Sequence, residues 1–260
     1  MMEVLDSLDA FTRRTGAVLS LGMFDGVHTA HREVLRTLSA KARETGSAAV
    51  VITFHPHPRA LLSGQPFPLI VTQEEKKGLL ERQQTDIWCR LAFTRELAAT
   101  TPEALLELLD SKLKINHIVL GYNHNFGAGK SGGIHTLNLL RSRYGFGITE
   151  IPRMLSEGRE VSSSAIRTAL REGDLRTASR LLGYPYFAQV RLLDRPDSRT
   201  LRVTVPPEKL LPAPGTYDGL WGQQPTRIEI MDHNQMLLIF GQPAPDAPPT
   251  QPHPLYWSNL

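Results

Sequence analysis

The sequence predicts an α/β fold in which a Rossmann-like, doubly wound parallel sheet is followed by a small, shortened β domain. Two observations support this expectation. Strand-like and helix-like patterns alternate up to about residue 155, which is typical of parallel sheets with helices on both faces. The chain also has 260 residues, 41% of them hydrophobic, which is enough for one sizeable α/β domain with a smaller companion.

The expected elements follow from the hydrophobic periodicity of the chain. Short apolar runs predict strands at residues 17–21, 47–54, 86–93 and 117–121 and around 148–151. Amphipathic or charged patterns predict helices at about 27–43, 73–82, 101–112 and 134–143, the third of them opened by a Thr-Pro-Glu start. Ligands of such sheets bind beyond the carboxyl ends of the strands. We therefore look for the site in the segments that follow predicted strands.

Composition narrows the classes of partner. The formal net charge is only +3 and the basic residues are scattered, so we expect an anionic small substrate and no nucleic acid. The chain has no long apolar span, and residues 1–6 lack a basic start followed by an apolar core. These features predict a cytoplasmic protein with no membrane partner. The lone Cys89 cannot form an internal disulfide, and we expect it to be a buried structural thiol.

The first motif is the segment 22–31, where a predicted strand passes into a predicted helix. His28 and His31 stand one helical turn apart, and a helix N-terminus offers free N–H groups and a positive dipole end to an anion. The motif is therefore interpreted as a phosphate cradle, the alternative being two ordinary surface or half-buried histidines. No third ligand follows at metal-binding spacing, so no protein metal site is expected. The turn before the histidines contains Gly22, Phe24, Asp25 and Gly26.

The second motif, residues 53–58, directly follows the second predicted strand and reads Thr-Phe-His-Pro-His-Pro. Its two prolines stiffen the loop and restrict the conformation of His57 before Pro58. The motif predicts either a rigid ligand-binding loop or a rigid turn with an exposed histidine.

The third motif is a loop at residues 121–133 that contains five glycines. The glycine pattern is incomplete as a phosphate-binding P-loop, and the alternative interpretation is a flexible connection. A loop rich in Asn and His amid glycines at a strand end favours ligand binding. The loop contains Asn123, Asn125 and Phe126.

The fourth motif, residues 161–167, places three serines before a predicted helix. One hydroxyl is explained as a helix N-cap. A cap requires only one hydroxyl, but this segment has three, from Ser162, Ser163 and Ser164, and a guanidinium one turn later, from Arg167. Together with helix N–H groups they suit a leaving pyrophosphate.

The four motifs together resemble the adenylyltransferase module of the prokaryotic bifunctional riboflavin kinase/FAD synthetase family. The segments GMFDGVHTAH, TFHPHP, GYNHNFG and VSSSAIR occur in the family's order and at comparable spacing. Within the first segment, Ala30 stands where the nucleotidyltransferase signature H-x-G-H has glycine. The resemblance covers roughly residues 15–187, and it implies domains at 1–187 and 188–260.

The resemblance implies FMN adenylyltransferase activity, in which AMP passes from ATP to FMN and Mg²⁺ is carried with ATP. It assigns catalytic roles to His28, His31 and Arg167. It assigns ATP binding to Gly22, Phe24, Asp25, Gly26, Ser162, Ser163 and Ser164, and flavin binding to His57, Pro58, Asn123, Asn125 and Phe126. Two alternatives stay open, a nucleotidyltransferase acting on another small phosphorylated acceptor and a non-catalytic flavin- or nucleotide-binding protein.

The C-terminal part departs from the family pattern. Members of the family have a kinase entry motif similar to Gly-Arg-x-x-Gly-Phe-Pro-Thr-Ala-Asn, and residues 198–207 lack its glycine turn and its Thr/Asn pair. The Pro-rich tail at 242–254 is expected to be too stiff to complete a barrel core. We therefore expect residues 188–260 to form a degenerate β domain without riboflavin kinase activity.

Overall fold

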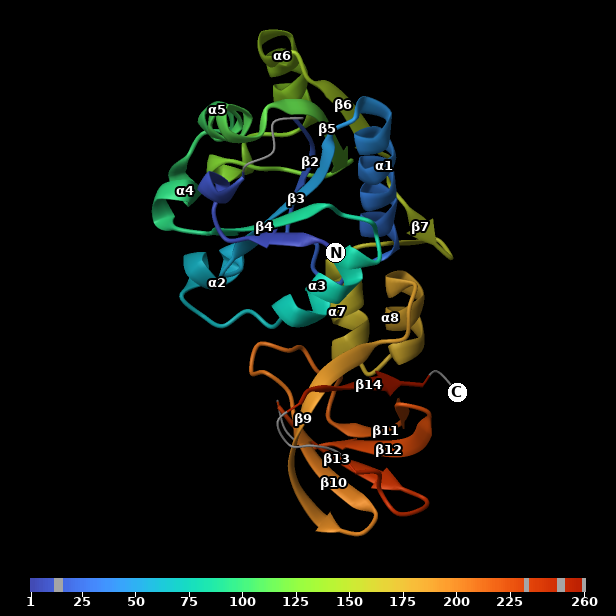
Figure 1. Ribbon diagram of the computed structural model, residues 1–260. Helices are drawn as coiled ribbons and strands as arrows, with labels where there is room; N and C mark the ends of the chain where they lie inside the picture. The colour runs from blue at the N-terminus through green and yellow to red at the C-terminus, as the bar shows by residue number, and fades with distance from the viewer. Residues whose placement is uncertain (12–15, 232–233, 247–250, 259–260) are drawn as a thin grey trace. The chain divides into compact units, whose positions relative to one another are not determined.

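The computed structural model describes residues 1–11, 16–231, 234–246 and 251–258. The chain forms two compact units, which Figure 1 shows from blue at the N-terminus to red at the C-terminus. The first unit comprises Met1–Phe67 and Lys77–Met154, and the second comprises Pro68–Lys76 and Leu155–Leu260. A short segment between two parts of the first unit therefore belongs to the second.

The first unit is built on a six-stranded sheet in the order β1-β4-β3-β2-β5-β6, with every neighbouring pair parallel. In that order the strands are Glu3–Leu5, Ile87–Ala92, Ala48–His55, Ala17–Leu21, Ile115–Gly121 and Gly147–Ile151. The expected doubly wound parallel sheet is confirmed. The edge strand β1 was not predicted, because three residues are too few to show a periodic pattern.

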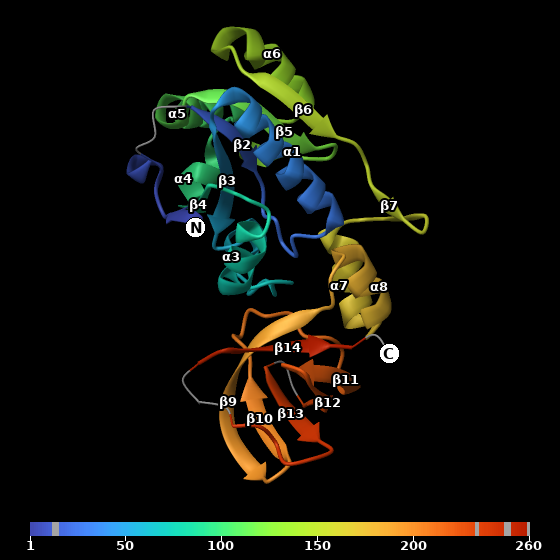
Figure 2. The same ribbon diagram turned by 45° about the vertical axis from the view of Figure 1, so that its right-hand side comes forward.

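Helices cover both faces of this sheet. The helices in this part of the chain are α1 (Thr29–Thr45), α2 (Pro58–Ser63), α3 (Gln73–Glu81), α4 (Arg95–Ala99), α5 (Pro102–Leu113) and α6 (Ile134–Tyr144), and the first four residues of α3 belong to the second unit. Figures 1 and 2 show α1 and α5 on opposite sides of the strands. Alternate strand residues point to opposite faces, and the face that includes Leu19 and Val50 packs with Leu105 and Leu109 of α5.

The second unit contains two helices and a closed barrel. The helices are α7 (Ser163–Arg171) and α8 (Leu175–Leu182), preceded by a short hairpin of β7 (Leu155–Ser156) and β8 (Arg159–Glu160). The barrel order is β10-β13-β12-β11-β14-β9, and its neighbouring strands are antiparallel. Strands β9 to β14 are Phe187–Asp197, Thr200–Thr204, Gly215–Trp221, Gln224–Ile230, Gln235–Phe240 and His253–Trp257. The expected domain boundary between residues 187 and 188 lies next to the start of β9 at Phe187. We keep this boundary as a proposal.

The expectation that the Pro-rich tail cannot complete a barrel core is wrong. Strand β14 lies at the end of that tail and closes the barrel by pairing with β9 and β11. Leu255 and Trp257 are both fully buried, since alternate residues of a barrel strand point inward. The strand that closes the barrel thus includes the last two residues of the tail, His253 and Pro254, which pair with Val190 and Gln189 of β9.

The segment at 68–76 is held in the second unit by main-chain and side-chain bonds. The Leu69 N–H donates to Glu208 O at 2.6 Å, and the Leu210 N–H donates to Leu69 O at 2.8 Å. Lys209 Nζ lies 2.7 Å from Glu75 Oε2, and both side chains are fully buried. The segment therefore packs as part of the unit that contains the barrel.

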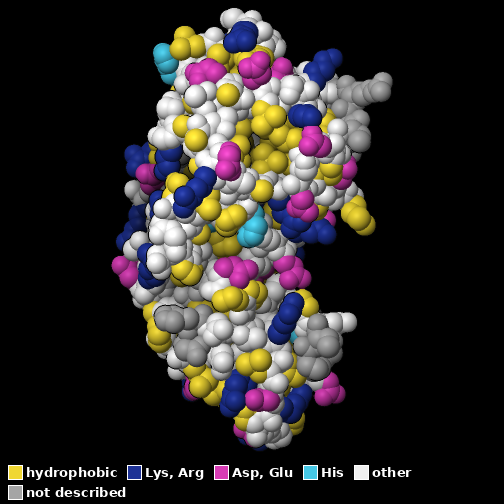
Figure 3. All heavy atoms as spheres, turned by 90° about the vertical axis from the view of Figure 1, so that its left-hand side faces the viewer, with side chains coloured by type: hydrophobic (Ala, Val, Ile, Leu, Met, Phe, Trp, Pro, Cys, Tyr) yellow, Lys and Arg dark blue, Asp and Glu magenta, His cyan; other side chains and the backbone are white. Residues whose placement is uncertain are grey.

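The surface carries mixed charge. On the face drawn in Figure 3, Lys and Arg side chains are interspersed with Asp and Glu, in keeping with the small net charge. Among the described residues, no helix is both long and apolar enough to cross a membrane.

Candidate active site

A strained turn connects the end of β2 to the start of α1. Phe24, Gly26 and Val27 have φ angles of 46°, 88° and 36°, a region that residues with a Cβ rarely occupy. The turn is held by two main-chain bonds, Gly22 N to Ile52 O at 3.0 Å and Val27 N to Phe24 O at 3.2 Å. Backbone strain of this kind concentrates at functional sites, where the surrounding structure maintains it.

The two histidines of the first motif lie in direct contact at the start of α1. The helix begins at Thr29 with His28 as its N-cap, and His28 Nδ1 accepts a hydrogen bond from the His31 N–H at 3.3 Å. The two rings stack with centroids 3.6 Å apart, and the Phe24 ring lies 5.0 Å from His31. The predicted pairing of the histidines is present within the first unit.

His28 is neutral at physiological pH. It is 4% exposed, and its burial, with a smaller effect of Arg32, lowers the pKa of its imidazole to about 3. Because Nδ1 accepts a hydrogen bond, the neutral ring carries its proton on Nε2. His28 therefore offers a ligand a hydrogen-bond donor rather than a positive charge.

The third motif reaches the same turn through His124, which is not among the predicted site residues. A Cβ placed on Gly22 would lie 3.7 Å from His124 Cε1 and 3.5 Å from Phe24 Cε2, so the loops after β2 and β5 meet there. Burial lowers the pKa of His124 to about 4. Its Nε2 is buried and has no hydrogen-bond partner among the residues with described positions. Its position next to Gly22 could not be read from the sequence.

The other predicted residues of the third motif have different environments. Asn125 is exposed, and its Nδ2 donates to Asn123 O at 3.0 Å. Phe126 is 7% exposed and packs in the hydrophobic core of the sheet. The flavin contacts of these three residues stay a prediction.

The second motif runs from the end of β3 to the start of α2. His57 is the N-cap and Pro58 the first helical residue, and His57 Nδ1 accepts from the Arg59 N–H at 3.1 Å. The His57 ring stacks on Phe67 with centroids 4.1 Å apart, and the Arg59 guanidinium lies 5.4 Å from the centre of the Phe67 ring. Phe67 and Arg59 were missed because the sequence does not show which aromatic ring His57 contacts.

The fourth motif lies in the second unit. The Ser162 Oγ accepts from the Ala165 N–H at 3.2 Å and caps α7, as predicted for one of the serines. Ser163 and Ser164 form the first turn of α7. Arg167 is 5% exposed, and its guanidinium donates to the Pro68 carbonyl. That Arg167 contacts the same nucleotide as His28 and His31 stays a prediction.

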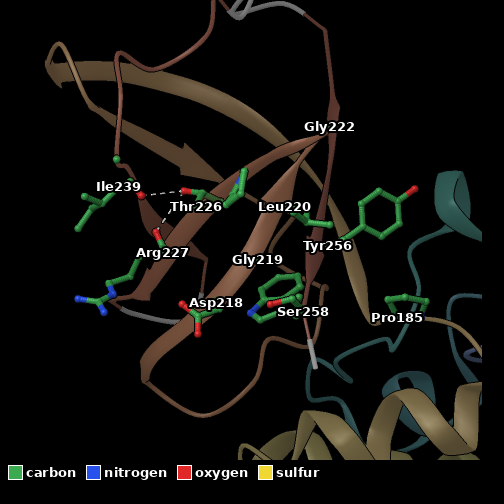
Figure 4. Close-up of a pocket in the computed structure, with 13 residues that line it drawn as sticks. Pro185, Asp218, Gly219, Leu220, Gly222, Thr226, Arg227, Ile239, Tyr256 and Ser258 are labelled. Atoms are coloured by element: carbon green, nitrogen blue, oxygen red, sulfur yellow. Dashed lines mark hydrogen bonds between the residues drawn. The ribbon is translucent and has the colours of Figure 1, made fainter. Parts of the chain in front are cut away.

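The barrel carries a groove of about 980 Å³ that the sequence did not indicate. In Figure 4, Arg227 and Ile239 lie at one end of the lining and Tyr256 and Pro185 at the other. The Thr226 Oγ1, also in this lining, donates to Ile239 O at 3.1 Å. The lining is mostly apolar, and Asp218 and Arg227 are its charged residues.

In the described ranges of the chain, no group of three or more His, Cys, Asp or Glu side chains is arranged to hold a metal ion.

Comparison with known proteins identifies the family. The family model described as FAD synthetase matches residues 11–165. The chain belongs to the FAD synthetase family. The predicted resemblance is thus confirmed, and the match covers the first three motifs and most of the fourth.

Relatives of this FAD synthetase family chain include bifunctional and single-function proteins. It is 34% identical over 174 residues to the bifunctional riboflavin kinase/FMN adenylyltransferase of Bacillus subtilis, covering 66% of this chain and 54% of that protein. It is 30% identical over 203 residues to an FAD synthetase of Listeria monocytogenes, covering 77% and 80%. The chain thus spans about half the length of the Bacillus relative.

A solved structure supports the fold. The crystal structure titled macrolide-efflux protein from Streptococcus pneumoniae superposes with a TM-score of 0.84 at 22% identity. The match covers 99% of this chain and 89% of the other. At this identity, the similarity shows that the two chains share the fold.

Proposed function

We propose that this protein is an FMN adenylyltransferase, which transfers AMP from ATP to FMN and releases FAD and pyrophosphate. The observation that carries the proposal is the stacked pair of His28 and His31 at the N-terminus of α1 in a chain of the FAD synthetase family. A helix N-terminus with two imidazoles suits a triphosphate. We further propose that the reaction takes place in the cytoplasm.

The chemistry is an in-line displacement at phosphorus. An oxygen of the FMN phosphate forms a bond to the α-phosphorus of ATP, and the bond from that phosphorus to the α,β-bridging oxygen breaks. The bonding electron pair leaves with pyrophosphate. Because a phosphate monoester is already an anionic nucleophile, no general base is needed. Catalysis then consists of alignment and stabilisation of developing charge.

The chain's own residues supply these two effects. The neutral His28 donates a hydrogen bond from Nε2 to the triphosphate. The first N–H groups of α1 add donors next to it. Ser162, Ser163, Ser164 and Arg167 are proposed to hold the leaving pyrophosphate. Mg²⁺ enters with ATP as part of the substrate, bound mainly by phosphate oxygens and water.

We propose that FMN is held by the loops after β3 and β5. The ring pair of His57 and Phe67 offers an aromatic surface of the kind on which planar ring systems stack. Pro58, Asn123, Asn125 and Phe126 complete the proposed flavin contacts. The barrel is proposed to lack riboflavin kinase activity, since residues 198–207 lack the glycine turn and Thr/Asn pair of the family's kinase motif.

The test supplies the full chain with Mg-ATP and one acceptor at a time, and follows pyrophosphate release and product by chromatography. Stoichiometric pyrophosphate and FAD with FMN support the proposal. Pyrophosphate release only with another phosphorylated acceptor, such as phosphopantetheine, overturns the choice of FMN, and FMN binding without turnover overturns catalysis. A parallel incubation with riboflavin and Mg-ATP is expected to give no FMN. Steady FMN formation would refute the proposal that the barrel lacks riboflavin kinase activity.

A further inference from the structure

A hollow of about 300 Å³ lies in the first unit between α1 and the turn that follows α3. It is lined by Arg36, Ser39, Arg43, Arg82, Gln83 and Gln84. Arg36, Ser39 and Arg43 share one face of α1, because residues three, four and seven apart lie on the same side of a helix. The volume is at the lower end of the range for small-molecule sites.

Two of the three guanidinium groups that line the hollow keep their charge uncompensated. Arg36 is engaged by Glu33, with Nη2 at 2.6 Å from a carboxylate oxygen. Arg43 Nη1 instead donates to the uncharged Gln84 Oε1 at 2.8 Å. Within the part of the chain that the structure describes, the Arg82 side chain has no ion pair or hydrogen bond. Two positive charges thus line a small concave surface that contains no acidic side chain among its described lining residues.

The wall opposite α1 is held by contacts of a serine hydroxyl on the helix with main-chain carbonyls of the turn. Ser39 Oγ lies 3.0 Å from Gln83 O and 3.2 Å from Gln84 O, and this ties the turn to the helix. Gln84 has a φ of 57°, a left-handed conformation that its surroundings must maintain. A ligand that enters the hollow therefore meets a wall that is already ordered, and less conformational entropy is lost on binding.

The hollow is separate from the candidate active site. Arg36 and Arg43 follow the N-cap His28 along the same helix. At 1.5 Å per residue they lie about 12 Å and about 22 Å from it along the helix axis. One small ligand cannot contact both the histidine pair and Arg43.

We propose that this hollow is a second anion site, which binds a phosphoryl polyanion such as inorganic pyrophosphate or the phosphate chain of a nucleotide. Guanidinium groups bind phosphate oxygens through paired, charge-assisted hydrogen bonds. Two uncompensated guanidiniums match a ligand with at least two negative charges, whereas a single carboxylate satisfies only one of them.

The test is isothermal titration of the full chain with inorganic pyrophosphate at low ionic strength and without metal. Wild-type protein is expected to bind at the hollow and, if the proposed function holds, also at the histidine pair. The double variant Arg43→Gln/Arg82→Gln should weaken binding at the hollow by about tenfold for each guanidinium removed. His31→Ala should leave that site intact, so failure of the proposed function and failure of this inference are distinguishable.

A matched control is Arg141→Gln/Arg143→Gln on α6, which removes the same charge outside the hollow. It is expected to bind pyrophosphate as wild type does. Equal weakening in the control would overturn the proposal, because the effect would then be one of net charge. Unchanged binding in Arg43→Gln/Arg82→Gln would also overturn it, and citrate bound as tightly as pyrophosphate would refute the assignment to phosphoryl ligands.

Discussion

The imidazole rings of His28 and His31 lie stacked with their planes inclined by only 15°, and His28 Nδ1 accepts the main-chain N–H of His31 at 3.3 Å. One side chain thus caps the helix, packs on its neighbour and offers its remaining N–H to a ligand. The arrangement requires a neutral His28, because a proton on Nδ1 would replace the accepted hydrogen bond. Burial favours that neutral form by lowering the pKa of His28 to about 3.

This burial makes the stability of the protein depend on pH. Below its ordinary pKa of 6.5, His28 takes up a proton in the unfolded chain but not in the folded one until about pH 3. The folded state therefore loses stability as the pH falls through this window, by up to about 1.4 kcal/mol per pH unit. His28→Asn keeps a side-chain acceptor for the cap and removes the titration. Urea unfolding at pH 7.5 and 5.5 should show about 1 kcal/mol less loss for the variant than for wild type.

The control for this measurement is His135→Asn, which removes an exposed histidine of α6. It should retain the pH dependence of wild type. Equal loss of stability in wild type and His28→Asn would show that His28 titrates normally in the folded state, against the burial described above.

His31 is expected to act on the reaction itself. Replacing it by alanine removes a preorganised polar group from the proposed phosphate cradle, and losses of this kind reduce rates by on the order of 10²-fold. We expect kcat/KM for FAD formation to fall by about that factor in His31→Ala, with the far-ultraviolet circular dichroism spectrum unchanged. His135→Ala on α6 provides a control with wild-type rates. An unchanged kcat/KM in His31→Ala would remove this residue from the mechanism.

Ala30 in the first turn of α1 is expected to limit how closely ATP approaches the backbone. Glycine has no Cβ, so Ala30→Gly should lower the KM for Mg-ATP severalfold, at a cost of less than about 1 kcal/mol in stability. Ala40→Gly, in the middle of the same helix, should show the stability cost without the change in KM. If both variants leave KM unchanged, the Cβ of Ala30 does not limit nucleotide binding.

The sequence predicted the parts of the fold that local patterns determine. The five predicted strands of the sheet are short, mostly apolar segments. Each agrees with an observed strand to within two residues at either end. The predicted placement of His28 and His31 one helical turn apart also follows from local geometry, since residues three apart on a helix are neighbours. The Ser162 cap is local in the same way.

Local sequence patterns do not predict features that depend on contacts between residues far apart in the chain. The neutral state of His28 results from burial by the surrounding fold, and His124 meets Gly22 only because β5 pairs with β2. Closure of the barrel by β14 depends on its pairing with β9 and β11, and the local pattern of a short strand that begins inside a Pro-rich segment does not show these partners. The packing of residues 68–76 in the second unit depends on Lys209, more than 130 residues along the chain.

The last prediction concerns this packing, which includes a fully buried ion pair. Lys209 Nζ donates to Glu75 Oε2 at 2.7 Å and to the carbonyl oxygens of Ile70 and Phe187, each at 2.8 Å. Lys209→Met would leave the Glu75 carboxylate buried without its cation. Loss of one partner of such a pair costs about 3–5 kcal/mol, and we expect a decrease of that size in the free energy of unfolding measured with urea.

The double variant Glu75→Gln/Lys209→Met separates the buried charge from the lost contacts. Glutamine keeps one carbonyl oxygen, which can accept from the Gln189 N–H as Glu75 Oε1 does at 2.7 Å, and it leaves no uncompensated charge. The double variant should therefore be more stable than Lys209→Met alone, although it carries one more substitution. If the two variants unfold at the same urea concentration, the cost arises from lost hydrogen bonds and packing around Lys209, and the charge of Glu75 contributes nothing to it.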